Sequence, residues 1–354
     1  MSATTSPTQI PARRIPEFSH PLWRRVLVTR ESAIIALLLL VAIVASIIVP
    51  HFGSPITVTF LLLDMAPVLM IALPMTLVII TGEIDLSVAS VMGLSSVMIG
   101  IFTHAGWPIP LAAVVALVVG LIAGAVNGLL VTVIGLPSLA VTIGTLALFR
   151  GIAVGLLGTT AVTDFPETWT HLASNTIGDS PIPNVTILIA VLAVVFAIVL
   201  HLTPFGRGVY AIGLSKDAAA FSGINVRRTK FVLYLLTGVV SALAGIYYTL
   251  RFGSARGDNA TGLELTVIAS VLLGGVSIFG GRGALHGVLA GALLIGTLAS
   301  ALRLAGITSD VISVVTGTLL VLSVVTTSFL SWLQRTRAGA GRKRRAEGES
   351  VSSG

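Results

Sequence analysis

The sequence predicts an all-α polytopic membrane protein with about ten transmembrane helices and an inverted repeat, and three observations support this fold class. Of the 354 residues, 55% are hydrophobic and only 10% are charged, whereas a soluble domain has about 25% charged residues. Apolar stretches of about 20 residues, the length that crosses a bilayer, recur along the chain. The second half also repeats a pattern of small and polar residues found in the first.

Ten apolar stretches divide the chain. Residues 1–31 are polar and proline-rich and are expected to form a cytoplasmic tail. They are not expected to be a secretory signal, because no small-residue cleavage site follows the first apolar run. Residues 32–331 are expected to form the transmembrane domain, and residues 332–354 a basic cytoplasmic tail. The expected helices lie near 32–50, 57–81, 86–103, 110–134, 137–158, 184–203, 229–251, 263–281, 284–305 and 308–331.

Positive charge sets the expected orientation. Sixteen of the 21 basic residues lie in three segments, which fall on one side if there are ten helices, and the positive-inside rule makes that side cytoplasmic. The loop 159–183 has no Lys or Arg and is expected outside. The net charge of +7 therefore requires no nucleic acid, and the basic tail is interpreted as an anchor for anionic membrane lipid. The basic residues are Arg13, Arg14, Arg24, Arg25 and Arg30; Arg207, Lys216, Arg227, Arg228 and Lys230; and Arg335, Arg337, Arg342, Lys343, Arg344 and Arg345.

Small and polar residues recur in the same order in two parts of the chain, so expected helices 2–5 resemble expected helices 7–10. Because the odd number five separates equivalent helices, the halves would insert with opposite orientation. Inverted repeats are a recurrent transporter design in which a central site lies between the halves. A chance match between Gly-, Ala- and Leu-rich helices is the alternative. The matching segments are 85–91, 120–125, 135–138 and 144–146, then 264–271, 287–292, 306–309 and 317–319.

Two sets of glycines are spaced four residues apart within expected helices. Gly120, Gly124 and Gly128 share one helix face, as do Gly287 and Gly291. Small residues on one face let helix backbones approach closely, which is how helices associate in lipid. These glycines are therefore expected to serve packing rather than chemistry.

Two carboxylates interrupt the apolar region between expected helices 2 and 3, in the segment 81–87. An ionised side chain at bilayer depth costs at least about 2.5–3.5 kcal/mol, so Glu83 and Asp85 are expected to line a water-filled path or to have a partner. Gly82 suits a break between helices. Asp85 or Ser87 could instead cap the following helix, which would account for one carboxylate but not both.

Further polar residues lie within the apolar segments. Asp64 and Asn127 would either line a cavity or bond across helices, and both alternatives stay open. Arg150, Arg251 and Arg303 lie near predicted helix ends, where long side chains extend to the interface. Because carboxylates and hydroxyls hydrogen-bond sugars, the expected path suits an uncharged polyhydroxylated solute. Its expected residues are Glu83, Asp85, Ser87, Asp64, Asn127, Glu264 and Thr266.

The cytoplasmic segment 204–230 is predicted to contain a short helix. Ser215 can cap a helix over residues 216–222, and Gly223 can end it. A helix of this length is not stable alone. It must therefore dock on its own bundle or on a partner.

The chain lacks the motifs of an enzyme or an ATPase. There is no Gly-x4-Gly-Lys-Ser/Thr phosphate loop, no His-Glu-x2-His zinc motif, no credible Ser/His/Asp set and no cysteine. A transporter of this kind would take its energy from a partner or from an ion gradient.

Three motifs resemble the permease subunits of ribose-type ABC importers, a group that includes xylose, arabinose, rhamnose and autoinducer carriers. They lie at 76–88, 211–226 and 274–283, and the resemblance extends over residues 57–330. It implies that segment 213–223 is a coupling helix that docks on an ATPase. The residues to which this role is transferred are Gly213, Asp217, Ala218, Ala219 and Gly223.

The resemblance also implies partners and a location. These are a separate ATPase that holds ATP and Mg²⁺, an extracytoplasmic sugar-binding protein, a second permease copy or paralogue, and the bacterial cytoplasmic membrane. Glu83 stands where the family usually has Gly, and Ala89 where Gly is common. The alternative is an ion-coupled secondary transporter in which Glu83, Asp85 or Glu264 titrates.

Overall fold

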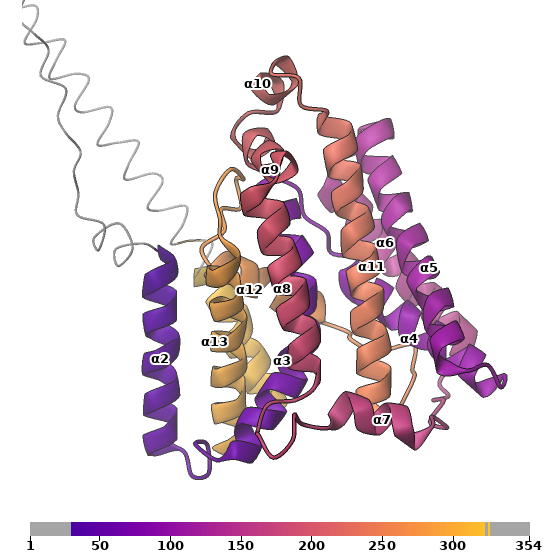
Figure 1. Cartoon of the computed structure of the whole chain (residues 1–354), viewed down its shortest axis with the longest axis vertical. Coiled ribbons are helices and arrows are strands. Elements are labelled where there is room, and N and C mark those ends of the chain that lie inside the picture. The colour runs from indigo at the N-terminus through magenta and orange to yellow at the C-terminus, as the bar shows by residue number, and fades with distance from the viewer. Residues whose placement is uncertain (1–29, 323–324, 326–354) are drawn as a thin grey trace, which may run out of the picture.

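The computed structural model describes residues 30–322 and 325, and most of this part of the chain is helical (Figure 1). Each of the ten expected transmembrane segments contains a helix. These helices are α2 (Arg30–Ile48), α3 (Pro55–Ile80), α4 (Val88–His104), α5 (Ile109–Leu129) with its π-helical extension η1 (Leu130–Ile134), α6 (Ser138–Leu157), α8 (Val185–Leu202), α11 (Val226–Phe252), α12 (Leu263–Leu273), α13 (Leu285–Leu304) and Ser309–Leu322.

Seven of these ten helices are long and apolar enough to cross a membrane. The other three, α4, α12 and Ser309–Leu322, are shorter. No strand occurs among the described residues beyond isolated bridges. The prediction of an all-α polytopic membrane protein is confirmed. Residues 1–29 of the expected N-terminal tail, with its basic residues before Arg30, lie outside the described residues. So do the whole tail 332–354 and, apart from residue 325, the end of the expected helix 308–331 after Leu322.

The predicted helix over 263–281 is wrong in its second half, because α12 ends at Leu273. Gly274 packs directly on α13, where a Cβ would lie 2.7 Å from the amide nitrogen of Val288. Gly275 then adopts a φ of +94°, a conformation that favours glycine and ends helices. The following residues form a loop that returns the chain to α13.

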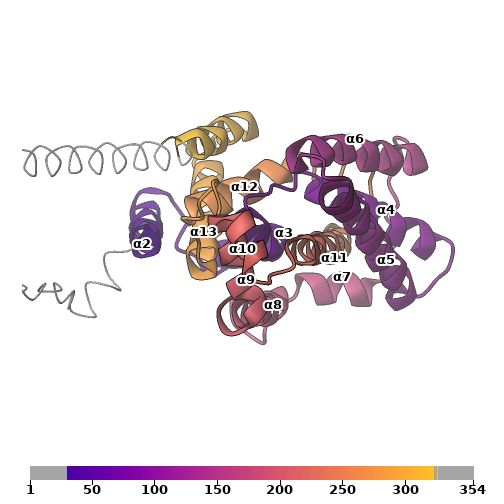
Figure 2. The same cartoon turned by 90° about the horizontal axis from the view of Figure 1, so that it is seen from above.

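Helix α3 is the centre of the bundle. Every residue from Met65 to Ile80 is buried, as expected for a helix that is apolar all round. The helix continues through Pro67 and Pro74. By contrast, α2 lies at the edge beside α13, with large apolar side chains exposed along its length (Figures 1 and 2). These exposed side chains form a surface suited to lipid.

The view along the bundle shows two groups of helices with α3 and α11 between them (Figure 2). One group contains α4, α5 and α6. The other contains α12, α13 and the yellow helix Ser309–Leu322, with α2 beyond them. These two groups correspond to each other in the sequence repeat, which matches α4, α5 and α6 of the first half with α12, α13 and Ser309–Leu322 of the second.

Three short helices mark the two ends of the bundle. Helices α9 (Pro204–Leu214) and α10 (Lys216–Phe221) lie at one end, and α7 (Glu167–Ser174) crosses the other end (Figure 1). Helix α11 connects the ends with its 27 residues, a length of about 40 Å at 1.5 Å per residue. These ends are called the α10 end and the α7 end below.

The connections that precede α4 and α12 occupy opposite ends. The turn 81–87, before α4, contacts α10 through Glu83 and Lys216. The loop 253–262, before α12, pairs with Val162 near α7 through Ala255. This placement agrees with the opposite orientation predicted for the two halves.

The two sets of regularly spaced glycines pack helices against each other, as predicted. A Cβ on Gly120 would lie 2.6 Å from the carbonyl oxygen of Gly238 in α11, and one on Gly291 would lie 2.6 Å from the carbonyl oxygen of Ser270 in α12. Both distances are far below van der Waals contact. The glycines therefore allow α5 to pack on α11, and α13 on α12, through their backbones.

We predict that Gly120→Val lowers the free energy of unfolding by about 1–3 kcal/mol, because the larger side chain must push α5 from α11. The apparent melting temperature of the purified protein in detergent measures this effect. Gly144→Val in α6 is the matched control, because a Cβ there meets no atom within 4 Å. Equal losses in the two variants would contradict the prediction.

Candidate functional site

Glu83 joins the turn 81–87 to the α10 end of the bundle. Its carboxylate accepts hydrogen bonds from Lys230 of α11 and, at 3.1 Å, from Lys216 of α10. Lys230 is buried, with 7% of its side chain exposed, whereas Lys216 is 58% exposed. One carboxylate thus connects its own turn to two elements whose lysines lie 133 and 147 residues later in the chain.

Both lysines favour the ionised form of Glu83, which lies outside the spanning helices. Burial alone would raise the pKa of Glu83, but the hydrogen bond from Lys230 and the charges of both lysines outweigh it and lower the pKa below the usual value. The carboxylate therefore stays ionised at neutral pH. Such a group is poorly suited to take up and release protons during a transport cycle.

Asp85 lies in a separate buried cluster, with 2% of its surface exposed. One carboxylate oxygen accepts from the backbone N–H and the hydroxyl of Ser87, at 3.0 and 2.7 Å, and the other accepts from the Thr237 hydroxyl at 2.9 Å. The Asn127 amide donates to the Ser87 hydroxyl at 2.7 Å. This cluster joins α5 and α11 to the start of α4.

The capping alternative for this turn holds in part. Ser87 occupies the N-cap position of α4 but makes no side-chain cap hydrogen bond, while Asp85 binds the backbone N–H of Ser87. Asp85 therefore binds the backbone at the start of α4 and, at the same time, accepts a hydrogen bond from Thr237 of α11. Asn127 bonds across helices, which answers one of the questions left open by the sequence.

Backbone atoms of three elements meet beside this turn. The N–H of Gly281 donates to the carbonyl of Ile80 at 2.8 Å. Gly213, in the last turn of α9, packs on both groups so closely that a Cβ has no room. Gly213, which was expected to couple to an ATPase, thus packs against α3 of the same chain.

Helix α10 has the predicted capping. Ser215 accepts a hydrogen bond from the Ala218 N–H, and Gly223 adopts a φ of +84° after the helix. Ala219 is buried against the bundle, whereas Asp217, Ala218 and Gly223 are exposed. Phe221 is 93% exposed, so the outer face of α10 combines an apolar ring with a carboxylate.

The remaining expected pathway residues lie toward the α7 end and do not join the Glu83 or Asp85 clusters. Asp64 bonds across helices to Arg251 of α11, at 3.6 Å, and to Arg303 of α13, at 3.2 Å. Glu264 stands in the first turn of α12, and Thr266 lines a pocket there. The predicted pathway residues therefore occupy four places rather than one: at Glu83, around Asp85, at Asp64 and at the start of α12.

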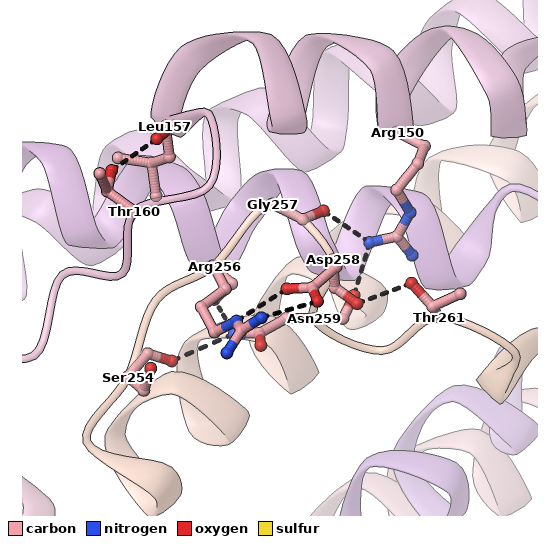
Figure 3. A network of polar contacts seen from close by, with 10 residues as sticks. Arg150, Leu157, Thr160, Ser254, Arg256, Gly257, Asp258, Asn259 and Thr261 are labelled. Atoms are coloured by element: carbon pink, nitrogen blue, oxygen red, sulfur yellow. Dashed lines mark hydrogen bonds and ion pairs between the residues drawn. The ribbon is translucent and has the colours of Figure 1, made fainter.

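The expectation that three arginines extend to the interface is incomplete, because all three also have partners within the protein. Arg251 and Arg303 pair with Asp64, and Arg150 donates to the carbonyls of Gly257 and Asn259 at 2.8 and 2.6 Å (Figure 3). The reason is that loops and helix ends of other segments lie within reach of each guanidinium. Arg150 thereby fixes the loop before α12.

Two functional residues were missed from the sequence as partners of Glu83. Lys216 and Lys230 were counted only as charges that set orientation. Lys230 carried a usable signal, because it falls inside the expected helix 229–251, where a buried ammonium needs a counter-ion. Helix α9 was also missed, although Thr203 and Pro204 form a typical helix start.

No group of His, Cys, Asp and Glu that could hold a metal ion occurs within residues 30–322 and 325. The clusters instead contain hydrogen-bonded pairs of opposite charge and hydroxyls. These groups can hydrogen-bond to one another or to a polar solute, and they hold neighbouring helices together.

The chain matches a family model described as "Branched-chain amino acid transport system / permease component" over residues 57–324. The chain belongs to this family. As a member it is an ABC importer permease, which favours the ATP-driven interpretation over the ion-coupled one. Its relatives are likewise transport permease subunits.

Curated relatives are similar over most of the chain. The permease is 36% identical to the autoinducer 2 import system permease protein LsrD of Klebsiella pneumoniae over 301 residues, covering 83% of this chain and 90% of the relative. It is 34% identical to LsrD of Salmonella typhimurium over 328 residues, covering 89% and 98%. With LsrD of Photorhabdus luminescens it shares 37% over 280 residues, covering 75% and 84%. No solved structure matches the chain.

We predict that Glu83→Gln destabilises the permease by about 3–5 kcal/mol, because it leaves the ammonium of Lys230 buried without a counter-ion. Lys216→Met removes the exposed member of the same cluster and is expected to cost under about 1 kcal/mol. Thermal unfolding in detergent compares the two variants. If Lys216→Met is as damaging as Glu83→Gln, the buried pair is not the stabilising one.

Proposed function

We propose that this permease imports autoinducer 2, or a closely similar monosaccharide-like solute, into the cytoplasm with energy from a separate ATPase. The observation that carries the proposal is the similarity to LsrD permeases, at 34–37% identity over 75–89% of this chain. The family description names branched-chain amino acids instead. Branched-chain amino acids are therefore the second class of solute to test.

The proposed orientation places the α10 end in the cytoplasm. Five basic residues lie in the segment from Arg207 to Lys230 at this end, and the positive-inside rule favours a cytoplasmic position for them. Both termini, and the basic tail with its affinity for anionic lipid, would then be cytoplasmic. The α7 end faces outward, where an extracytoplasmic binding protein would deliver solute.

The outer face of α10 is the proposed ATPase contact. It is exposed over Asp217, Ala218 and Phe221, while its inner face is fixed by buried Ala219. Aromatic side chains are enriched at protein interfaces, where they fill pockets of the partner, and Phe221 is exposed enough to do so. ATP and Mg²⁺ would be held by the ATPase, and a second permease copy or paralogue would complete the transporter.

Two connections are proposed to carry movement of α10 to the solute path. Lys216 links α10 to Glu83 and so to the turn before α4. Gly213 links α9 directly to the end of α3 at Ile80. A displacement of α10 on ATP binding would thus shift α3 and α4 together.

Uptake assays test the function. Vesicles or cells that contain this permease, the ATPase and the binding protein encoded with it should accumulate labelled autoinducer 2 only in the presence of ATP, and should not accumulate leucine. ATP-dependent leucine uptake without autoinducer 2 uptake would assign the permease to amino acid import. Uptake by the permease alone in liposomes under a proton gradient would replace the ATP-driven proposal.

We predict that Asp217→Arg and Phe221→Asp each reduce ATP-dependent uptake and the stimulated ATPase rate by at least about tenfold, while the permease stays folded. Both side chains are exposed, so their loss costs the bundle little, whereas an interface anchor is worth about 2 kcal/mol or more. Asp179→Arg, an equivalent charge reversal on an exposed residue near the α7 end, is the control for folding and membrane insertion. Normal uptake in both α10 variants would remove α10 from the ATPase interface.

A further inference from the structure

An open pocket of about 670 Å³ lies beside the start of α12, away from the Glu83 and Asp85 clusters. Its wall is the loop 256–262, and its other sides come from Tyr248 of α11, Thr266 of α12 and Ser313 of the last described helix. Val68 of the central helix α3 closes part of it. The pocket therefore extends from the α7 end toward α3, and apart from Val68 it is lined by residues of the second repeat.

The loop that forms the wall is held rigidly. Arg150 binds two of its carbonyls, and the side-chain amide of Asn259 donates to the Ser96 hydroxyl at 2.8 Å and to the Ser254 carbonyl at 3.1 Å. Figure 3 shows Arg150 reaching the loop from α6. A binding wall that is ordered before the ligand arrives loses less entropy when it binds.

The polar groups of the pocket suit a neutral ligand with several hydroxyls. Arg256 and Asp258 face each other through two hydrogen bonds of 2.9 and 3.0 Å, and both side chains are more than half exposed. Their charges cancel, yet the guanidinium keeps N–H donors and the carboxylate keeps acceptor sites that can bind two neighbouring hydroxyls of a solute. Thr261, Thr266 and Ser313 add hydroxyls.

Two further features favour a solute over a purely structural loop. Tyr248 supplies an aromatic ring to the pocket, and such a ring can pack on the carbon face of a sugar-like molecule. Hydrogen bonds from Arg256 lower the pKa of Asp258, so its carboxylate remains an acceptor at neutral pH. The volume also lies within the range of about 300–1,000 Å³ that is common for small-molecule sites.

We propose that this pocket is the outer receiving site of the permease, where an uncharged polyhydroxylated solute binds to Arg256 and Asp258 and packs on Tyr248. The proposal rests on the proposed function for its orientation and solute class. It adds a binding site within the permease itself, separate from any binding protein.

A protection experiment tests the site, and the absence of cysteine from the chain makes it direct. Ser313→Cys places one thiol in the pocket, and Thr160→Cys places one on an exposed residue outside it. Right-side-out membrane vesicles that contain the permease and its ATPase, without binding protein, are treated with a membrane-impermeant maleimide. We expect autoinducer 2 to slow labelling of Ser313→Cys at least fivefold and to leave Thr160→Cys unchanged.

Second variants separate binding from folding. In the Ser313→Cys background, Tyr248→Ala and Asp258→Asn should raise the autoinducer 2 concentration for half-maximal protection at least tenfold. Tyr248→Phe, which keeps the ring, should leave that concentration within about twofold. Identical protection in all of these variants would overturn the assigned contacts.

The remaining outcomes distinguish the proposals. If the intact transporter accumulates autoinducer 2 and labelling of Ser313→Cys is unaffected by it, the pocket proposal fails while the proposed function stands. Protection by added binding protein without solute, and not by solute alone, would make this surface a protein-docking site and also overturn the pocket. If Thr160→Cys resists the impermeant reagent but reacts after permeabilisation, the orientation fails, and the pocket proposal fails with it.

Discussion

The arrangement of this permease depends on one constraint, which is that a charge inside an apolar helical bundle must find its partner within the protein. Glu83 has Lys230, and Asp64 has Arg251 and Arg303. Because each of these pairs joins segments from different parts of the chain, the paired charges also hold those segments of the bundle together. Arg150 meets the constraint in another way, by binding backbone carbonyls.

The sequence was sufficient to predict the helices and their approximate order. Apolar length alone located all ten, and glycine spacing identified the faces on which α5 and α13 pack. The cap on α10 followed from Ser215 and Gly223, since both act within a few residues of themselves. Local chemistry and periodicity thus accounted for most of the fold.

The partners of the charged residues could not be predicted in the same way. Glu83 and Lys230 are 147 residues apart, and nothing in either local sequence specifies the other. The end of α12 at Leu273 was missed for a related reason, because Gly274 ends the helix where α13 packs against it. Asp64 and Asn127 were recognised as important, but only the three-dimensional structure shows that they bond across helices. The roles transferred to the exposed residues of α10 remain predictions.

The contact among Ile80, Gly213 and Gly281 involves backbone atoms alone. Side chains normally absorb small displacements by changing rotamer, and this contact has none to change. It therefore behaves as a stiff joint, and flexibility between the repeats must come from neighbouring residues. Gly275 and Gly283, both with positive φ and both outside this contact, are placed to provide it. Within the described structure, the loop between α12 and α13 combines a rigid point of attachment with a hinge a few residues away.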